Sequence, residues 1–220
     1  QQAHVAMQYT HLGSEIDFRQ SMMPEINKRT SHASAEMKSL RKPLYSNPRI
    51  PDKAKHQVTT ALAISHLSYN LQTWPSLNRT EDKLLRTKVR SLYRQAASGV
   101  FAPGDHISDE ALYAAVNQLS PHELATTSRL RYYRSLVLNA TPAAWSLLRL
   151  VHHESQSRNK HSWLSLLEAD FKWLELHTPT RIVLPPSHDA PARQAYAEAS
   201  SPGAWRGLIR RAAEIAKAIR

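Results

Sequence analysis

The run INKRTSHASAEMKSLRKPL, residues Ile26–Leu44, sets the helical character of this 220-residue chain. Its apolar and small side chains recur alternately four and three positions apart, which is the period of one face of an α-helix. These side chains are Ile26, Thr30, Ala33, Met37, Leu40 and Leu44. We therefore predict a helix that begins near Ser21 and ends by Asn47, because the residue before Pro48 is pushed out of the helical region.

Two further long helices are predicted to follow. Pro51 suits the first turn of a helix, where its missing amide hydrogen costs nothing. The apolar residues between Val58 and Leu71 surround more than half of that helix, which predicts a central place in a bundle. Asn78, with Glu81 three residues later, forms a capping-box pattern that predicts the start of a third helix running to about Ser98.

The second half of the chain carries signals of shorter helices. A capping hydroxyl precedes a proline at three predicted helix starts, namely Ser120–Pro121, Thr141–Pro142 and Ser201–Pro202. Ser108 is predicted to cap another helix. The prolines between Thr178 and Ala192 predict an extended linker.

The N-terminal residues have a different pattern. Val5, Met7 and Tyr9 alternate with other residues as in a strand, and Gly13 allows a turn. With 5 Gly and several long helical patterns, we expect an all-α helical bundle: three long helices plus shorter C-terminal helices, with at most a small N-terminal β-hairpin. The expected parts are a hairpin at 1–20, a helical bundle at 21–105, a second helical segment at 106–177, a Pro-rich linker at 178–200 and a basic amphipathic helix at 201–220.

The charge balance predicts a polyanionic partner. Lys and Arg number 29 against 18 Asp and Glu, which gives a net charge of +11. Such an excess indicates nucleic acid first and an acidic membrane surface second. The absence of cysteine excludes disulfides, thiolate zinc sites and cysteine nucleophiles. No apolar run reaches the roughly 18 residues of a membrane span, so no transmembrane segment is predicted.

Three basic clusters are the candidate nucleic-acid contacts: Lys28 to Lys42, Lys83 to Arg94 on the third helix, and Arg129 to Arg134. Arg86, Arg90 and Arg94 recur at every fourth position and so share one face of the third helix. Tyr132 and Tyr133 interleave with later arginines as candidate stacking surfaces. The alternative is a solvated basic face with the tyrosines in the core. The predicted nucleic-acid-binding residues are Lys28, Arg29, Lys38, Arg41, Lys42, Lys83, Arg86, Arg90, Arg94, Arg129, Arg131 and Arg134.

The sequence offers little for catalysis. A two-metal polymerase site needs neighbouring carboxylates, and the chain has no Asp-Asp pair. No nucleophile motif or phosphate-cradling Gly-rich loop occurs. The densest group of possible metal ligands, His152, His153, Glu154 and His161, departs from zinc-site spacing. We therefore predict no enzymatic activity, no metal and no cofactor.

Several short sequence motifs, spread over nearly the whole chain, follow one another in an order that is typical of a known protein family. They are Tyr9–Ser14, Glu25–Arg29 with Lys38–Arg41, Lys53–Lys55 through Tyr69 and Trp74, Leu84–Arg86, Arg129–Tyr132 and Trp205–Arg206. Together they resemble the region after the catalytic palm in reverse transcriptases of LINE-type (non-LTR) retrotransposons. The first is similar to the primer-grip hairpin and the next three to the thumb helices. The resemblance implies a thumb-like bundle at 21–105, with the catalytic aspartates upstream of Gln1.

Two features depart from that family. Thr10 and His11 stand between Tyr9 and the Leu12-Gly13 pair, where the family has a continuous Tyr-Leu-Gly-Ser. The Cys/His zinc element common at the family's C-terminus is missing from this sequence. Because the resemblance covers the thumb and not the active site, it implies binding rather than catalysis.

Three functions are consistent with these patterns. The first is a non-catalytic RNA- or DNA-binding module that grips the backbone of an RNA or RNA/DNA duplex without reading its sequence. The second is a structural subunit of a large ribonucleoprotein such as a mitochondrial ribosome, in contact with RNA and neighbouring proteins. The third is a fragment of an active reverse transcriptase whose palm lies elsewhere. A retroelement-like role implies the nucleus, and a ribonucleoprotein subunit implies the mitochondrion or another organelle.

Overall fold

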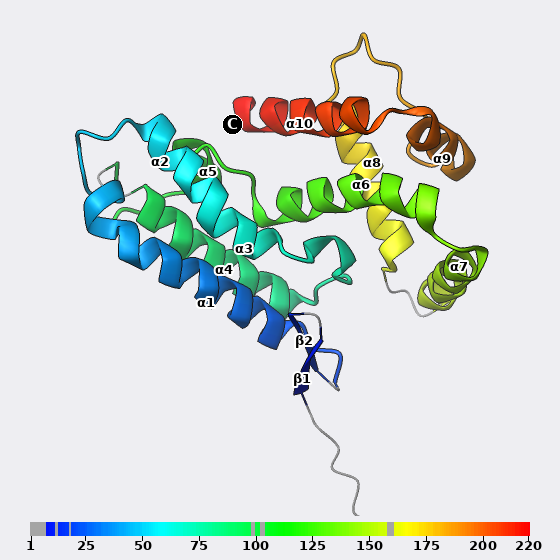
Figure 1. Ribbon diagram of the computed structural model, residues 1–220, viewed down its shortest axis with the longest axis horizontal. Helices are drawn as coiled ribbons and strands as arrows, with labels where there is room; N and C mark the ends of the chain where they lie inside the picture. The colour runs from blue at the N-terminus through cyan, green and yellow to red at the C-terminus, as the bar shows by residue number, and fades with distance from the viewer. Residues whose placement is uncertain (1–7, 12, 18, 98–99, 102–103, 158–160) are drawn as a thin grey trace, which may run out of the picture. The chain divides into compact units, whose positions relative to one another are not determined.

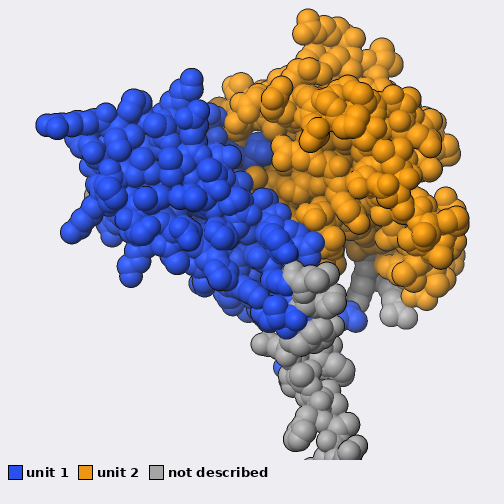
Figure 2. All heavy atoms as spheres, viewed as in Figure 1, with its two compact units in different colours: residues 1–70, 77–121 blue, residues 71–76, 122–220 orange. Residues whose placement is uncertain are grey.

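A computed structural model of the protein describes residues 8–11, 13–17, 19–97, 100–101, 104–157 and 161–220 (Figure 1). It divides the chain into two compact units, shown in different colours in Figure 2. Unit 1 consists of residues 1–70 and 77–121, and unit 2 of residues 71–76 and 122–220. The predicted all-α class is confirmed, with one small hairpin near the N-terminus.

The hairpin pairs β1 (Gln8–His11) with β2 (Ser14–Asp17) in antiparallel register. Gly13 forms the turn with a φ of +83°, in the left-handed region that glycine adopts without steric cost. A Cβ at Gly13 would also lie 3.3 Å from the Tyr69 hydroxyl, so the turn lies close against that side chain. The predicted strand positions Val5 and Met7 lie outside the described residues.

Unit 1 is otherwise helical. Its elements are α1 (Met23–Leu40), the π-helical turn η1 (Arg41–Tyr45), α2 (Asp52–Thr59), the π-helical turn η2 (Thr60–Ile64), α3 (Ser65–Ser68), α4 (Arg79–Ala96) and α5 (Asp109–Ala115). α1 packs along α4 and against η2 and α3 (Figure 1). The predicted apolar face of α1 supplies the contact, because Ile26, Ala33 and Met37 are fully buried.

The capping signals in unit 1 act as predicted. The Asn78 side chain accepts hydrogen bonds from the Thr80 and Glu81 amides, each at 3.0 Å. The Glu81 carboxylate accepts one from the Asn78 amide at 3.0 Å, which completes the capping box of α4. Ser108 Oγ accepts a hydrogen bond from the Ala111 amide and so caps α5.

Unit 2 packs its helices around an aromatic core. Its elements are α6 (Pro121–Asn139), α7 (Pro142–Ser157), α8 (Trp163–Leu176), α9 (Ala190–Ala199), α10 (Pro202–Ala218) and the short 3₁₀ turn η3 (Leu71–Thr73). The Tyr133 and Phe171 rings meet edge to face, with centroids 5.4 Å apart. Trp205 is buried beside them, and its Nε1 donates a hydrogen bond to the Leu130 carbonyl at 2.8 Å. Helices α6, α7 and α10 begin at the prolines expected from the sequence.

The structure corrects two of the expected parts of the chain, the linker at 178–200 and the boundary between residues 105 and 106. The predicted linker at 178–200 contains helix α9, which forms because Asp189 Oδ1 accepts from the Ala192 amide and Pro191 lies in the first turn, where proline is tolerated. The predicted boundary at 105/106 also fails, since α5 belongs to unit 1. The assignment of α5 to unit 1 depends on contacts between distant segments, for which the local sequence pattern carries no signal.

Candidate nucleic-acid interface

An open groove of about 560 Å³ lies on unit 1, where α1, η1 and α4 meet. Among the described residues that line it, half have cationic side chains and the other half have neutral polar ones. The lining residues are Ser34, Lys38, Arg41, Thr87, Arg90, Ser91, Arg94 and Gln95. Among the described residues that line this groove, none carries a carboxylate.

Helix geometry places these side chains together. Lys38 and Arg41 are three positions apart at the C-terminal end of α1, so they share a face, and the negative end of the helix dipole favours cations there. Arg90 and Arg94 are four positions apart on α4 and share a face in the same way. Because α1 and α4 pack together, the two cationic pairs line one groove.

The four cations differ in their partners. Neither the Lys38 ammonium nor the Arg41 guanidinium has an ion pair or hydrogen bond with another residue that the structure describes, and both side chains are exposed. Arg90 Nη1 lies 2.6 Å from Asp109 Oδ1, and its Nη2 donates to the Ile107 carbonyl. Arg94 Nη2 donates to the Asp105 carbonyl. The carbonyls of the segment before α5 therefore orient the α4 arginines, and Asp109 at the start of α5 partly neutralises Arg90. The α1 pair has no such partner among the described residues.

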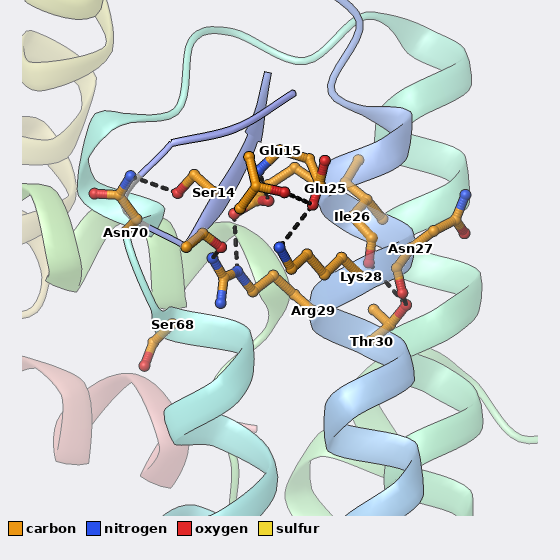
Figure 3. Close-up of polar contacts among 12 residues, drawn as sticks. Ser14, Glu15, Glu25, Ile26, Asn27, Lys28, Arg29, Thr30, Ser68 and Asn70 are labelled. Carbon is orange, nitrogen blue, oxygen red and sulfur yellow. Dashed lines mark hydrogen bonds and ion pairs between the residues drawn. The ribbon is translucent and has the colours of Figure 1, made fainter. Parts of the chain in front are cut away.

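Lys28 and Arg29 have a different role from the one predicted (Figure 3). The Arg29 side chain is buried; its Nε lies 2.8 Å from Glu25 Oε1, and its Nη2 donates to the Gly13 carbonyl at 2.6 Å. Lys28 Nζ lies 2.7 Å from Glu15 Oε1. These cations attach the hairpin to α1. The prediction of a nucleic-acid contact is therefore wrong for Arg29, and Lys28 is already ion-paired.

The cluster around residue 130 does not form one surface. Arg129 is only 4% exposed, and its guanidinium forms two hydrogen bonds with the buried Asp170 carboxylate. Arg134 is half-buried, and its Nε donates to the Ser200 carbonyl at 2.8 Å. Of these three arginines, Arg131 is the exposed one. The predicted contact is wrong for Arg129. The alternative interpretation, with both tyrosines in the core, holds for Tyr133 but not for Tyr132, whose side chain is 37% exposed.

The remaining predicted cations lie outside the groove. Arg86 is exposed and pairs with Asp82 at 2.8 Å, within the first turns of α4. Lys42 and Lys83 are exposed. The groove thus brings together four of the predicted residues, namely Lys38, Arg41, Arg90 and Arg94. The neutral lining residues were not predicted from the sequence. A serine or threonine near an arginine carries no sequence signal of a groove, and only the packing of α1 on α4 brings these residues to its walls.

Within the group of possible metal ligands near residue 152, the His152 side chain makes local hydrogen bonds. His152 Nδ1 lies 2.6 Å from Ser162 Oγ, and its Nε2 lies 3.0 Å from Gln156 Nε2. Within the part of the chain that the structure describes, no three side chains of the usual metal-ligand types come together. His152 therefore connects the end of α7 to the start of α8.

Comparison with protein-family models, with curated proteins and with solved structures gives no match. The resemblance to LINE-type reverse transcriptases consequently rests on the short sequence motifs alone. None of the described helices combines the length and the apolar character that a membrane span requires.

Proposed function

We propose that the chain is a non-catalytic nucleic-acid-binding module that holds the phosphate backbone of RNA, alone or paired with DNA, in the groove of unit 1. The observation that carries this proposal is a groove with four cationic side chains and, among the described lining residues, no carboxylate. The four cations that line the groove repel one another, and the attraction between each of them and the phosphates of a bound polyanion would offset that repulsion. Guanidinium groups add bidentate hydrogen bonds to phosphate oxygens.

The neutral lining residues support backbone contacts. Hydroxyl and amide side chains such as Thr87, Ser91 and Gln95 are common donors to phosphate and sugar oxygens. Contacts of this type fix the position of a nucleic acid but carry no sequence information. We therefore propose binding by charge and shape, with a steep dependence on salt because each bound phosphate releases counterions.

The motif resemblance is consistent with this proposal. In that resemblance α1 and α4 correspond to the first and third thumb helices, which together line the groove. The resemblance supports a grip on nucleic acid without supplying a catalytic residue. The third candidate, a fragment of an active reverse transcriptase whose palm lies elsewhere, is a weaker proposal, because only the short sequence motifs support it.

A structural subunit of a ribonucleoprotein is the second candidate, and one observation favours it. On α7 the side chains of Leu147, Leu150 and Val151 are 61%, 57% and 45% exposed and recur at three- and four-residue spacing, so they share a face. Exposed apolar surface of this kind is typical of a contact with another protein. In that role the groove would hold RNA and α7 would contact a neighbouring protein.

The test is the affinity of the full chain for an RNA duplex of about 16 base pairs, measured by fluorescence anisotropy near 0.1 M salt. The groove variant replaces Lys38 and Arg41 by Glu, and the control replaces the exposed Lys172 and Arg210 of unit 2 by Glu. Both variants change the net charge equally. We expect the groove variant to bind at least about tenfold more weakly and the control to retain most of the affinity. Equal losses in the two variants would show a general charge effect and would reject the groove.

A further inference from the structure

A second cavity on unit 1, of about 440 Å³, lies at the end of η1. Its walls are formed mainly by Tyr45, Ile50 and Val100 together with the prolines at 48 and 51. A volume in this range suits a small organic group rather than a protein segment.

We infer that this cavity binds one unpaired nucleobase of the RNA strand whose phosphate lies in the groove. The inference rests on the proposed function, since the groove supplies the backbone contacts. The cavity would give the protein a second site, at which it distinguishes a duplex that ends in an unpaired nucleotide from a blunt duplex.

The cavity walls suit a flat aromatic group. The Tyr45 side chain is fully buried, and its hydroxyl is fixed 3.0 Å from Thr59 Oγ1. Its ring therefore forms a fixed, buried floor beneath the cavity. The apolar surface that a ligand would meet comes from Pro48, Pro51 and Ile50, together with the exposed Val100. Proline rings and aliphatic side chains pack against the flat faces of nucleobases, with little preference between bases.

The polar groups suit the edge of such a ring. The Lys55 side chain is only 11% exposed, although it lies near the N-terminus of α2, where the helix dipole disfavours a cation. Its ammonium has three hydrogens, and the Asp52 carboxylate lies 3.5 Å away with its side chain 70% exposed. The cavity thus offers a donor and an acceptor side by side. The edge of an unpaired base presents both donors and acceptors, whereas a simple hydrocarbon presents neither.

The groove and the cavity share one structural element. Arg41 at the start of η1 lines the groove, and Tyr45 at its end lines the cavity. The Ser46 amide donates to the Arg41 carbonyl at 2.9 Å, so a single π-helical turn joins the two sites. The axial rise of one such turn is about 5 Å. A phosphate bound by Arg41 therefore brings its own or the adjacent base within reach of the cavity.

The experiment compares RNA duplexes of equal paired length that are blunt or carry one unpaired nucleotide at the 3′ or the 5′ end. Each overhang is also made without its base. We expect one of the two overhangs to bind the wild-type protein about tenfold more tightly than the blunt duplex, and this gain to vanish when the base is absent. If overhangs with and without a base bind alike, the cavity proposal is overturned, while the blunt-duplex affinity still tests the groove.

Two single substitutions test whether the cavity causes the tighter binding of the overhang duplex. Val100 is 54% exposed, so Val100→Trp can fill the mouth of the cavity without overpacking the core. The matched control is Val183→Trp, because Val183 is 86% exposed and lies in unit 2. We expect Val100→Trp to remove the overhang gain and to leave blunt-duplex binding intact, whereas Val183→Trp leaves both unchanged.

The outcomes separate the two proposals. Loss of the overhang gain in both tryptophan variants, or in neither, overturns the cavity and leaves the groove standing. Failure of every duplex to bind overturns the proposed function, and with it the inference that rests on it.

Discussion

The guanidinium of Arg129 binds the carboxylate of Asp170 in the interior of unit 2, with Nε 2.6 Å from Oδ2 and Nη2 2.9 Å from Oδ1. Thr126 Oγ1 donates a further hydrogen bond to Oδ1 at 2.6 Å. The contact joins α6 to α8 across 41 residues of sequence, and both charged side chains are almost fully buried. An arginine that looks like a surface cation in the sequence is thus part of the core.

Replacing Arg129 by Ala is expected to lower the free energy of unfolding of unit 2 by about 3–5 kcal/mol, because it leaves the Asp170 charge buried and unpaired. The measurement is chemical denaturation followed by circular dichroism. Arg131→Ala is the control, since Arg131 lies two positions away on α6 with an exposed side chain. Equal stability of the two variants would contradict the role assigned to the pair.

Replacing Glu81 by Ala is expected to destabilise unit 1 more than loss of a helix cap alone. Its carboxylate accepts from the Asn78 amide at 3.0 Å and from the Met22 amide at 2.8 Å, so it connects the starts of α4 and α1. We expect a loss of about 2 kcal/mol in thermal or chemical unfolding. Glu110→Ala, an exposed acidic residue in the first turn of α5, should change stability little.

Acid should loosen the attachment of the hairpin. Hydrogen bonds from Lys28 and then Thr10 hold the pKa of Glu15 below its ordinary value of 4.5. A lowered pKa in the folded state means that the contribution of Glu15 is present above pH 4.5 and is lost as the pH falls through the folded-state pKa. Titration by NMR should show the Glu15 carboxylate protonating at lower pH than a model peptide. In Lys28→Met that midpoint should rise, and an unchanged midpoint would contradict the ion pair.

The salt dependence of RNA binding provides an independent test of the groove. Replacing Lys38 and Arg41 by Ala should reduce the slope of log affinity against log salt by about 2, because each lost phosphate contact releases about one counterion fewer. Lys172→Ala should leave the slope near the wild-type value. A slope unchanged in the groove variant would mean that phosphates do not lie beside the α1 cations.

Much of the fold could be predicted because its signals are local. The capping box of Asn78 and Glu81, the cap at Ser108 and the helix starts at Pro142 and Pro202 all depend on residues within a few positions of one another. The helix over 190–199 was missed because its prolines were treated as breakers, although Pro191 lies in the first turn, where proline is compatible with a helix.

The candidate site could be predicted only in part. The pairing of Arg29 with Glu25 has a sequence signal, since the two residues are four positions apart and share a helix face. The pairing of Arg129 with Asp170 has none, because only the packing of α6 and α8 brings them together. Charge in the sequence therefore predicts the partner class, while tertiary contacts decide which cations remain available to it.

The chain passes between unit 1 and unit 2 after residues 70, 76 and 121, so neither unit is encoded by one uninterrupted stretch of its gene. The short segment Leu71–Ser76 matters to unit 2, because Trp163 Nε1 donates to the Gln72 carbonyl at 2.8 Å and Trp74 is buried. A fragment that simply begins at His122 would lack both. To transplant unit 2 into another protein, the coding sequence must be rearranged so that a new linker joins codons 71–76 to those of the later helices.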